Sequence, residues 1–186
     1  MILGKLRNRL GKYMLGTLPA LTEKRRKNIN LDEVQSCLLL GFIESQQDYD
    51  DLKWYYSKLK SDYGIFDVDA VFYIDIKEKK LPQYLENESK IVILNRNDTN
   101  FYGKPNDEKV ANLKQEYDLV IMPSRNPAIP LLFVNKSISA NTRSARNASW
   151  SEPYFDLLLS IREDETARYF AEQLERFLRM INKKTA

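Results

Sequence analysis

Short apolar segments alternate with segments of helical periodicity along most of the chain. Four runs contain no polar alternation, as is typical of strands whose two faces are both buried. They are residues 37–43, 70–74, 91–94 and 119–122. Two further strands are predicted, a polar edge strand at residues 140–146 and a last strand at residues 154–161.

Helices are predicted between these strands and at both ends of the chain, where apolar residues recur at steps of three and four. Gly64 is placed to end the second helix. The predicted helices cover residues 3–18, 48–63, 82–88, 107–117, 127–136 and 164–183.

The order of these elements predicts an α/β fold with a doubly wound, mainly parallel sheet of five to six strands, flavodoxin-like or related. The strand at residues 37–43 is expected inside the sheet, whereas the order of the strands is left open. We expect two parts, a basic amphipathic helical arm at residues 1–27 and a single α/β domain at residues 28–186.

Charge is distributed unevenly between these parts. Residues 1–27 carry eight cations and one acid, Glu23, so the arm has a charge of +7 and the remainder −4, for a total of +3. The cations are Lys5, Arg7, Arg9, Lys12, Lys24, Arg25, Arg26 and Lys27. An anionic partner fits this arm, and a membrane surface or a nucleic acid could supply it. The favoured interpretation is plainer: the stripe Leu3, Leu6, Leu10, Met14 and Leu18 docks the helix on the body.

Composition excludes several kinds of chemistry. The chain has no histidine and one cysteine, Cys37, which rules out an intrachain disulfide, a His-containing triad and a zinc site built on Cys or His. Cys37 lies in an apolar run, so a packed core residue is expected rather than a nucleophile. With 43% hydrophobic residues and no apolar run of about 18 residues, a globular domain without a spanning helix is expected. We expect it in the cytoplasm, with peripheral attachment to a membrane as an open alternative.

Polar residues follow the predicted strands, at the edge where doubly wound sheets bind ligands. The candidates are Glu44, Asp75, Arg96, Asn97, Lys104 and Arg125. Their cations and amides suit an anionic ligand, although a solvated edge has the same composition. Neither glycine-rich phosphate motif is present, and the loop after residue 43 contains no glycine. No cofactor and no metal ion are therefore predicted.

Three short strings carry a resemblance to a known family. They are Asn-Phe-Tyr-Gly-Lys-Pro at residues 100–105, Tyr-Asp-Leu-Val-Ile at residues 117–121 and Tyr-Phe-Asp-Leu-Leu at residues 154–158. With the basic first helix, this layout resembles an uncharacterised bacterial domain family of unknown function. The resemblance covers nearly the whole chain and implies the fold, but no activity and no catalytic residue. Residues 142–146 depart from the Lys-Val-Gly string common in such sequences.

The sequence thus favours an uncharacterised, non-enzymatic binding or adaptor domain of the bacterial cytoplasm. It would meet a membrane surface or a protein through its arm. Enzyme activity stays open and is disfavoured. The first alternative is an enzyme or small-molecule binder that recognises an anionic ligand at the carboxyl ends of the strands. A weaker alternative is nucleic-acid binding through the basic arm.

Overall fold

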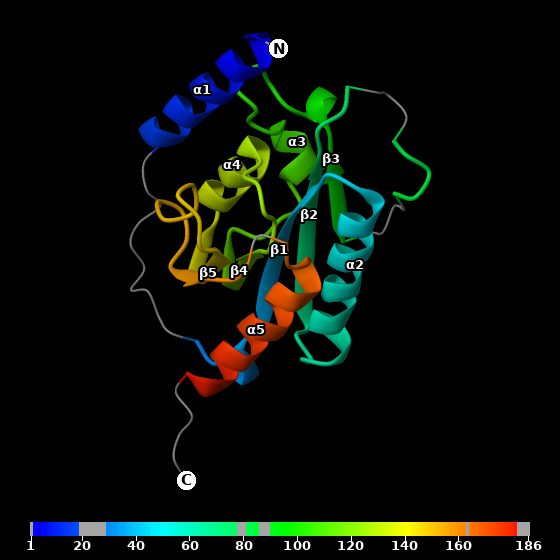
Figure 1. Cartoon of the computed structure of the whole chain (residues 1–186), viewed down its shortest axis with the longest axis vertical. Coiled ribbons are helices and arrows are strands. Elements are labelled where there is room, and N and C mark those ends of the chain that lie inside the picture. Colours follow the sequence, from blue (N-terminus) through cyan, green and yellow to red (C-terminus); the bar gives the residue numbers. More distant parts are fainter. Residues whose placement is uncertain (1, 19–28, 78–80, 86–89, 163, 182–186) are drawn as a thin grey trace.

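Six parallel strands form one sheet in the order β3-β2-β1-β4-β5-β6 (Figure 1). The computed structural model describes residues 2–18, 29–77, 81–85, 90–162 and 164–181. The strands are β1 (Ser36–Ile43), β2 (Asp67–Ile74), β3 (Ile91–Leu94), β4 (Glu116–Met122), β5 (Ser139–Arg146) and β6 (Leu157–Leu159). The predicted α/β class is confirmed, and β1 lies inside the sheet as expected.

Helices cover both faces of this sheet. The face against α2 and α5 forms one apolar core, and α4, with α1 packed on it, covers the other face. The helices are α1 (Ile2–Thr17), α2 (Gln46–Ser61), α3 (Asp107–Val110), α4 (Ile129–Ser137) and α5 (Ala167–Met180), with short 3-10 helices η1 (Leu31–Glu33) and η2 (Arg96–Asp98). The sheet is therefore doubly wound.

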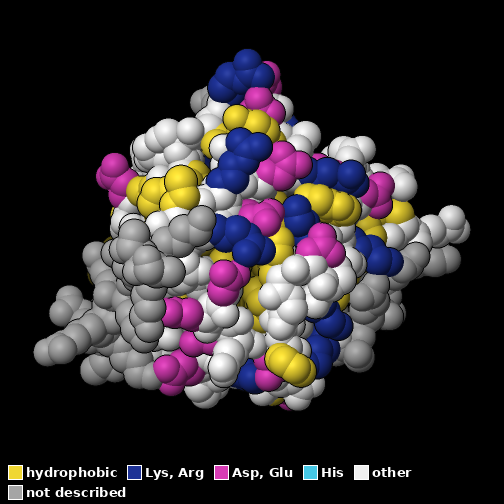
Figure 2. Space-filling model, turned by 90° about the horizontal axis from the view of Figure 1, so that it is seen from below, with side chains coloured by type: hydrophobic (Ala, Val, Ile, Leu, Met, Phe, Trp, Pro, Cys, Tyr) yellow, Lys and Arg dark blue, Asp and Glu magenta, His cyan; other side chains and the backbone are white. Residues whose placement is uncertain are grey.

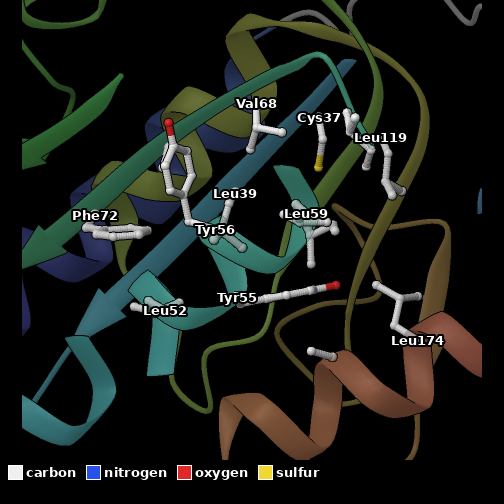
Figure 3. Close-up of a cluster of buried hydrophobic side chains, with 14 of the residues drawn as sticks. Cys37, Leu39, Leu52, Tyr55, Tyr56, Leu59, Val68, Phe72, Leu119 and Leu174 are labelled. Carbon is white, nitrogen blue, oxygen red and sulfur yellow. The ribbon is translucent and has the colours of Figure 1, made fainter. Parts of the chain in front are cut away.

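Burial on both faces explains the unbroken apolar run of β1. Successive side chains of a strand point to opposite faces, so Leu39 packs toward α2 and α5 while Leu38 and Leu40 pack toward α4. Figure 3 shows the first of these cores, which contains Leu39 of β1, Leu59 of α2 and Leu174 of α5. Both faces of β1 must therefore be apolar.

The strand order defines where the winding reverses. The chain proceeds outward from β1 through β2 to β3, and outward in the other direction from β4 through β5 to β6. This is the order of the two-halved doubly wound sheet, whereas flavodoxin-type sheets have the order 2-1-3-4-5. The reversal between β1 and β4 leaves a crevice at the carboxyl ends of those two strands.

Three predicted elements differ from the structure. The strand predicted at the edge, residues 140–146, is interior, because β6 pairs with its outer side and is itself reduced to Leu157–Leu159. The helix predicted at residues 107–117 ends at Val110, since Tyr117 is drawn into β4, where its hydroxyl donates to Asp69 at 2.7 Å. Residues 82–85 form a turn, and the rest of the helix predicted to residue 88 lies outside the described residues.

Helix α1 packs on the body through Leu15, which is outside the predicted stripe, together with Met14, which belongs to it. Leu15 is fully buried, whereas Leu6 is 47% exposed. A Cβ atom on Gly11 would lie 2.6 Å from the backbone oxygen of Tyr102, so glycine permits this close approach. The predicted boundary at residue 27 and the cations at residues 24–27 lie outside the described residues. None of the helices in the described part of the chain is long and apolar enough to span a bilayer.

The amino ends of the strands carry charges of both signs. Figure 2 views this end from below Figure 1 and shows Lys and Arg side chains interleaved with Asp and Glu. Asp67 accepts hydrogen bonds from Lys90 and Lys114, and Arg179 donates to Asp32 at 2.8 Å. Among the described residues at this end, opposite charges therefore lie next to one another and partly neutralise each other.

Candidate functional site

The residues predicted at the carboxyl edge fall into two separate clusters. Asp75, Arg96 and Asn97 lie beyond β2 and β3, with Lys104 in the loop that follows. Glu44 and Arg125 lie beyond β1 and β4, at the reversal of the winding. The edge therefore does not bring all six residues together, and each cluster is described by itself.

The cluster beyond β2 and β3 is internally neutralised. The Arg96 guanidinium donates two hydrogen bonds to Asp75, from Nε to Oδ1 at 2.5 Å and from Nη2 to Oδ2 at 2.7 Å. Asn97 donates to the backbone oxygen of Lys77 at 3.0 Å, and Lys104 pairs with Asp107 at 2.8 Å. The two cations predicted to hold an anion here are thus each paired with a carboxylate of the protein.

Helix α1 contacts the loop that follows this cluster. Arg7 Nη2 donates to Thr99 Oγ1 at 2.6 Å, next to the loop that follows β3. The hydrogen bonds from Arg96 lower the pKa of Asp75, and burial partly opposes this effect. The positive charge of Arg7 also lowers the pKa of Asp75. Burial, and then the hydrogen bond to Asp75, raise the pKa of Tyr73. These interactions keep Asp75 ionised, and its carboxylate is hydrogen-bonded to Arg96 and Tyr73.

We expect Asp75→Asn to reduce the loss of stability on acidification. A carboxyl group whose pKa is lower in the folded state stabilises the protein above its unfolded pKa of about 3.9, and this contribution disappears as pH falls through the folded value. Urea unfolding of both proteins from about pH 6 to pH 2 measures the difference. Because the pair is partly exposed, the difference should stay within about 1 kcal/mol. If the free energies of unfolding of the two proteins changed with pH by the same amount, this prediction would be contradicted.

The cluster at the reversal of the winding lines a small cavity. Its polar lining consists of Glu44, Asp48, Ser124, Arg125 and Arg146. The cavity has a volume of about 20 Å³, on a measure where a single water requires about 10–15 Å³. It therefore has room for one water molecule and none for a nucleotide or a comparable organic ligand.

Hydrogen bonds between the walls explain why the cavity is small. Ser45 caps α2, and its backbone N–H donates to Asp48 Oδ2 at 2.8 Å. Asn126 Nδ2 donates to Glu44 Oε2 at 3.0 Å, and the Phe42 N–H donates to Ser124 Oγ at 2.8 Å. The loops after β1 and β4 are thus joined across the crevice by side chains of the protein itself.

Arg146 is a residue of this candidate site that the sequence analysis missed. Its side chain is 5% exposed, and its guanidinium donates to the backbone oxygens of Pro123 at 2.6 Å, Glu165 at 2.8 Å and Thr166 at 2.9 Å. Burial, with repulsion from Arg125, lowers its pKa to about 10, so it stays cationic at neutral pH. Nothing in the polar run at residues 140–146 distinguishes this buried arginine from exposed arginines elsewhere in the chain, such as Arg125.

Cys37 lies away from both clusters. It sits near the start of β1, is fully buried, and burial raises the pKa of its thiol well above its ordinary range, with Asp118 and Asp69 adding to the effect. A thiolate nucleophile is therefore disfavoured at this position. Across the described residues, no group of three or more Cys, Asp or Glu side chains is arranged to hold a metal ion.

The comparisons with known proteins bear on the family of this chain. No curated protein and no solved structure matches it. The model of one family, described as a family of unknown function (DUF6913), matches residues 7–181, which includes most of α1 and the whole sheet. The resemblance to a domain family of unknown function is thereby confirmed, and the chain belongs to DUF6913.

Proposed function

We propose that this protein is a non-enzymatic binding domain that acts through its outer surface and not through a ligand pocket at the carboxyl edge. The observation that carries this proposal is the small size of the cavity between the ends of β1 and β4. Ligand pockets commonly measure about 300–1,000 Å³. The cavity of about 20 Å³ found here is smaller by an order of magnitude, and its walls are hydrogen-bonded to each other.

The ionisable groups support the same proposal. General acid–base catalysis works best with a pKa near the operating pH. Instead, Arg96 lowers the pKa of Asp75, Lys114 lowers that of Asp67, and burial raises that of Cys37. Each shift leads away from neutrality and favours a structural charge or a packed thiol. We place the domain in the cytoplasm, which its single, free cysteine supports.

A second candidate function is the binding of a small oxyanion at the same crevice. Arg146 is a buried cation whose described partners are backbone oxygens, and the exposed Arg125 lies beside it on the cavity wall. The amino termini of α2 and α5 point to this region and favour an anion. Against it stand Glu44 and Asp48, which line the same cavity and repel anions. This candidate therefore ranks second.

We expect the melting temperature to change by less than about 1 °C with 5 mM phosphate, ATP, FMN or NADH. A ligand at a hundred times its Kd would stabilise the fold by about 2.7 kcal/mol, and for a chain of this length that corresponds to about 5–10 °C. Thermal unfolding followed by circular dichroism measures the change.

The control for this experiment is a pair of arginine variants. Arg125→Ala removes an exposed cation of the cavity wall, and Arg176→Ala removes an exposed cation of α5 away from it. Stabilisation by one of the four compounds that disappears in Arg125→Ala and persists in Arg176→Ala would overturn the proposed function and establish the second candidate.

A further inference from the structure

We infer that the outward face of α1 binds the surface of an anionic lipid membrane. This inference rests on the proposed function, because it names the surface and the partner of a binding domain. Figure 1 places α1 as the outermost element at the carboxyl end of the sheet. Figure 2 shows charges of both signs at the opposite end, whereas the charged residues of α1 are all cationic.

Contacts of α1 with the body determine which face is turned outward. Leu15 is fully buried, and Gly11 lies directly against the loop at Tyr102 and against Ile129, which begins α4. Lys136 of α4 donates to the backbone oxygen of Leu15. The helix is thus fixed through its Gly11–Leu15 side, and Leu6 and Tyr13 on its other side are exposed.

Apolar side chains occupy that other side. Leu6 is 47% exposed and Tyr13 is 69% exposed. They are seven residues apart, which is nearly two turns at about 3.6 residues per turn, so they project in the same direction. Leu10 lies between them in the sequence and is partly buried. A helix that is anchored by one face and apolar on the opposite face is suited to lie in a membrane interface.

The cations of α1 complement an anionic surface. The helix contains Lys5, Arg7, Arg9 and Lys12 and no acid. Arg7 is engaged by Thr99, whereas Arg9 and Lys12 are exposed. Cations near an anionic leaflet each strengthen attachment, and the attraction is screened by salt. The charge and the apolar stripe therefore act together on one helix.

Two aromatic rings beside α1 extend this surface. Phe101 is 55% exposed and Tyr102 is 39% exposed, in the loop whose backbone contacts Gly11. Tyr residues are enriched where membranes meet water. A polynucleotide would use the cations and could stack on the rings, but it would gain nothing from the exposed Leu6. The combination of leucine, tyrosine and cations therefore favours a lipid surface.

Co-sedimentation with vesicles tests the inference on the full-length protein. The vesicles are pure phosphatidylcholine, or phosphatidylcholine with 30% phosphatidylglycerol, in 50 or 300 mM NaCl. We expect at least tenfold stronger partition onto the anionic vesicles at 50 mM NaCl, and a clear decrease at 300 mM NaCl. Removal of two cations near an anionic membrane weakens the partition onto vesicles by about thirtyfold. We therefore expect Arg9→Glu/Lys12→Glu to bind the anionic vesicles at least tenfold more weakly than the unmodified protein.

Matched variants separate the site from net charge. Lys60→Glu/Arg176→Glu changes the same number of charges on exposed residues of α2 and α5, and should stay within about twofold of the unmodified protein. Leu6→Ser/Tyr13→Ser should lose severalfold while keeping the salt dependence. Circular dichroism checks that each variant is folded.

Equal loss in both charge variants, or no binding to anionic vesicles, would overturn the inference. Binding to oligo-dT without binding to vesicles would also overturn it and assign the helix to nucleic acid. These outcomes leave the thermal-shift result untouched, so failure of this inference is distinguishable from failure of the proposed function.

Discussion

Phe72→Ala is expected to lower the free energy of unfolding by about 3–5 kcal/mol. Phe72 is fully buried in the centre of β2, directly opposite Gly41 of β1, and its ring meets that of Tyr49 edge-on at 6.3 Å. The ring fills space that glycine leaves open, since a Cβ atom on Gly41 would lie 2.9 Å from Phe72 Cδ1. Alanine would leave a cavity between the sheet and α2, around which the surrounding structure relaxes only partially.

Phe66 provides a matched control for that substitution. It lies just before β2 and is 94% exposed, so Phe66→Ala removes the same atoms from a site without packing. We expect its effect to stay within about 0.5 kcal/mol. Urea unfolding of the three proteins measures both effects. Similar losses in the two variants would show that burial in this core does not control stability.

The central strands could be predicted because their burial is visible within each segment. A strand covered on both faces needs apolar residues at every position, and residues 37–43 and 119–122 satisfy this condition without reference to the rest of the chain. The fold class follows from such segments alternating with helices. The strand order could not be predicted, because it depends on pairing between segments far apart in the sequence.

The position of β5 inside the sheet could not be predicted, because the hydrogen-bond partners of its buried arginine lie far away in the sequence. Ser144 and Arg146 are buried in β5, and the partners of Arg146 come from the end of β4 and the loop before α5. A polar segment is typical of an edge strand when only its own residues are considered. Long-range hydrogen bonds permit the burial of Arg146, whereas the buried Ser144 hydroxyl has no hydrogen-bond partner among the described residues.

Helix α1 illustrates a different limit of sequence analysis. Its extent follows from periodicity, but the side that docks is determined by the close approach of Gly11 to Tyr102. A glycine contributes nothing to a hydrophobic stripe, so the predicted stripe, in which Leu6 is exposed and only Met14 is packed on the core among the described residues, does not identify the docked side. The candidate site behaves similarly: Glu44 and Arg125 lie where they were expected, whereas pairing of Asp75 with Arg96 requires the register of β2 and β3.

Arg146→Met is the second substitution with a large expected effect, a loss of about 2–4 kcal/mol in the free energy of unfolding. Methionine retains much of the side-chain volume but removes every donor. The backbone oxygens of Pro123, Glu165 and Thr166 would lose their hydrogen bonds from this guanidinium in a site that is almost closed to solvent. Arg146→Lys should recover only part of the loss, because one ammonium group cannot match the spread of the planar guanidinium.

Arg125→Met is the control for Arg146, because Arg125 lies on the same cavity wall but is exposed, and its replacement should change stability by less than about 0.5 kcal/mol. Urea unfolding with and without 5 mM phosphate distinguishes a structural role of the buried Arg146 from a role in binding an anion. As a structural tether of β4, β5 and the loop before α5, Arg146 should contribute the same stability in both conditions. If Arg146→Met were instead more stable than the unmodified protein, and phosphate stabilised only the latter, the buried charge would be retained for an anion, and the second candidate function would replace the first.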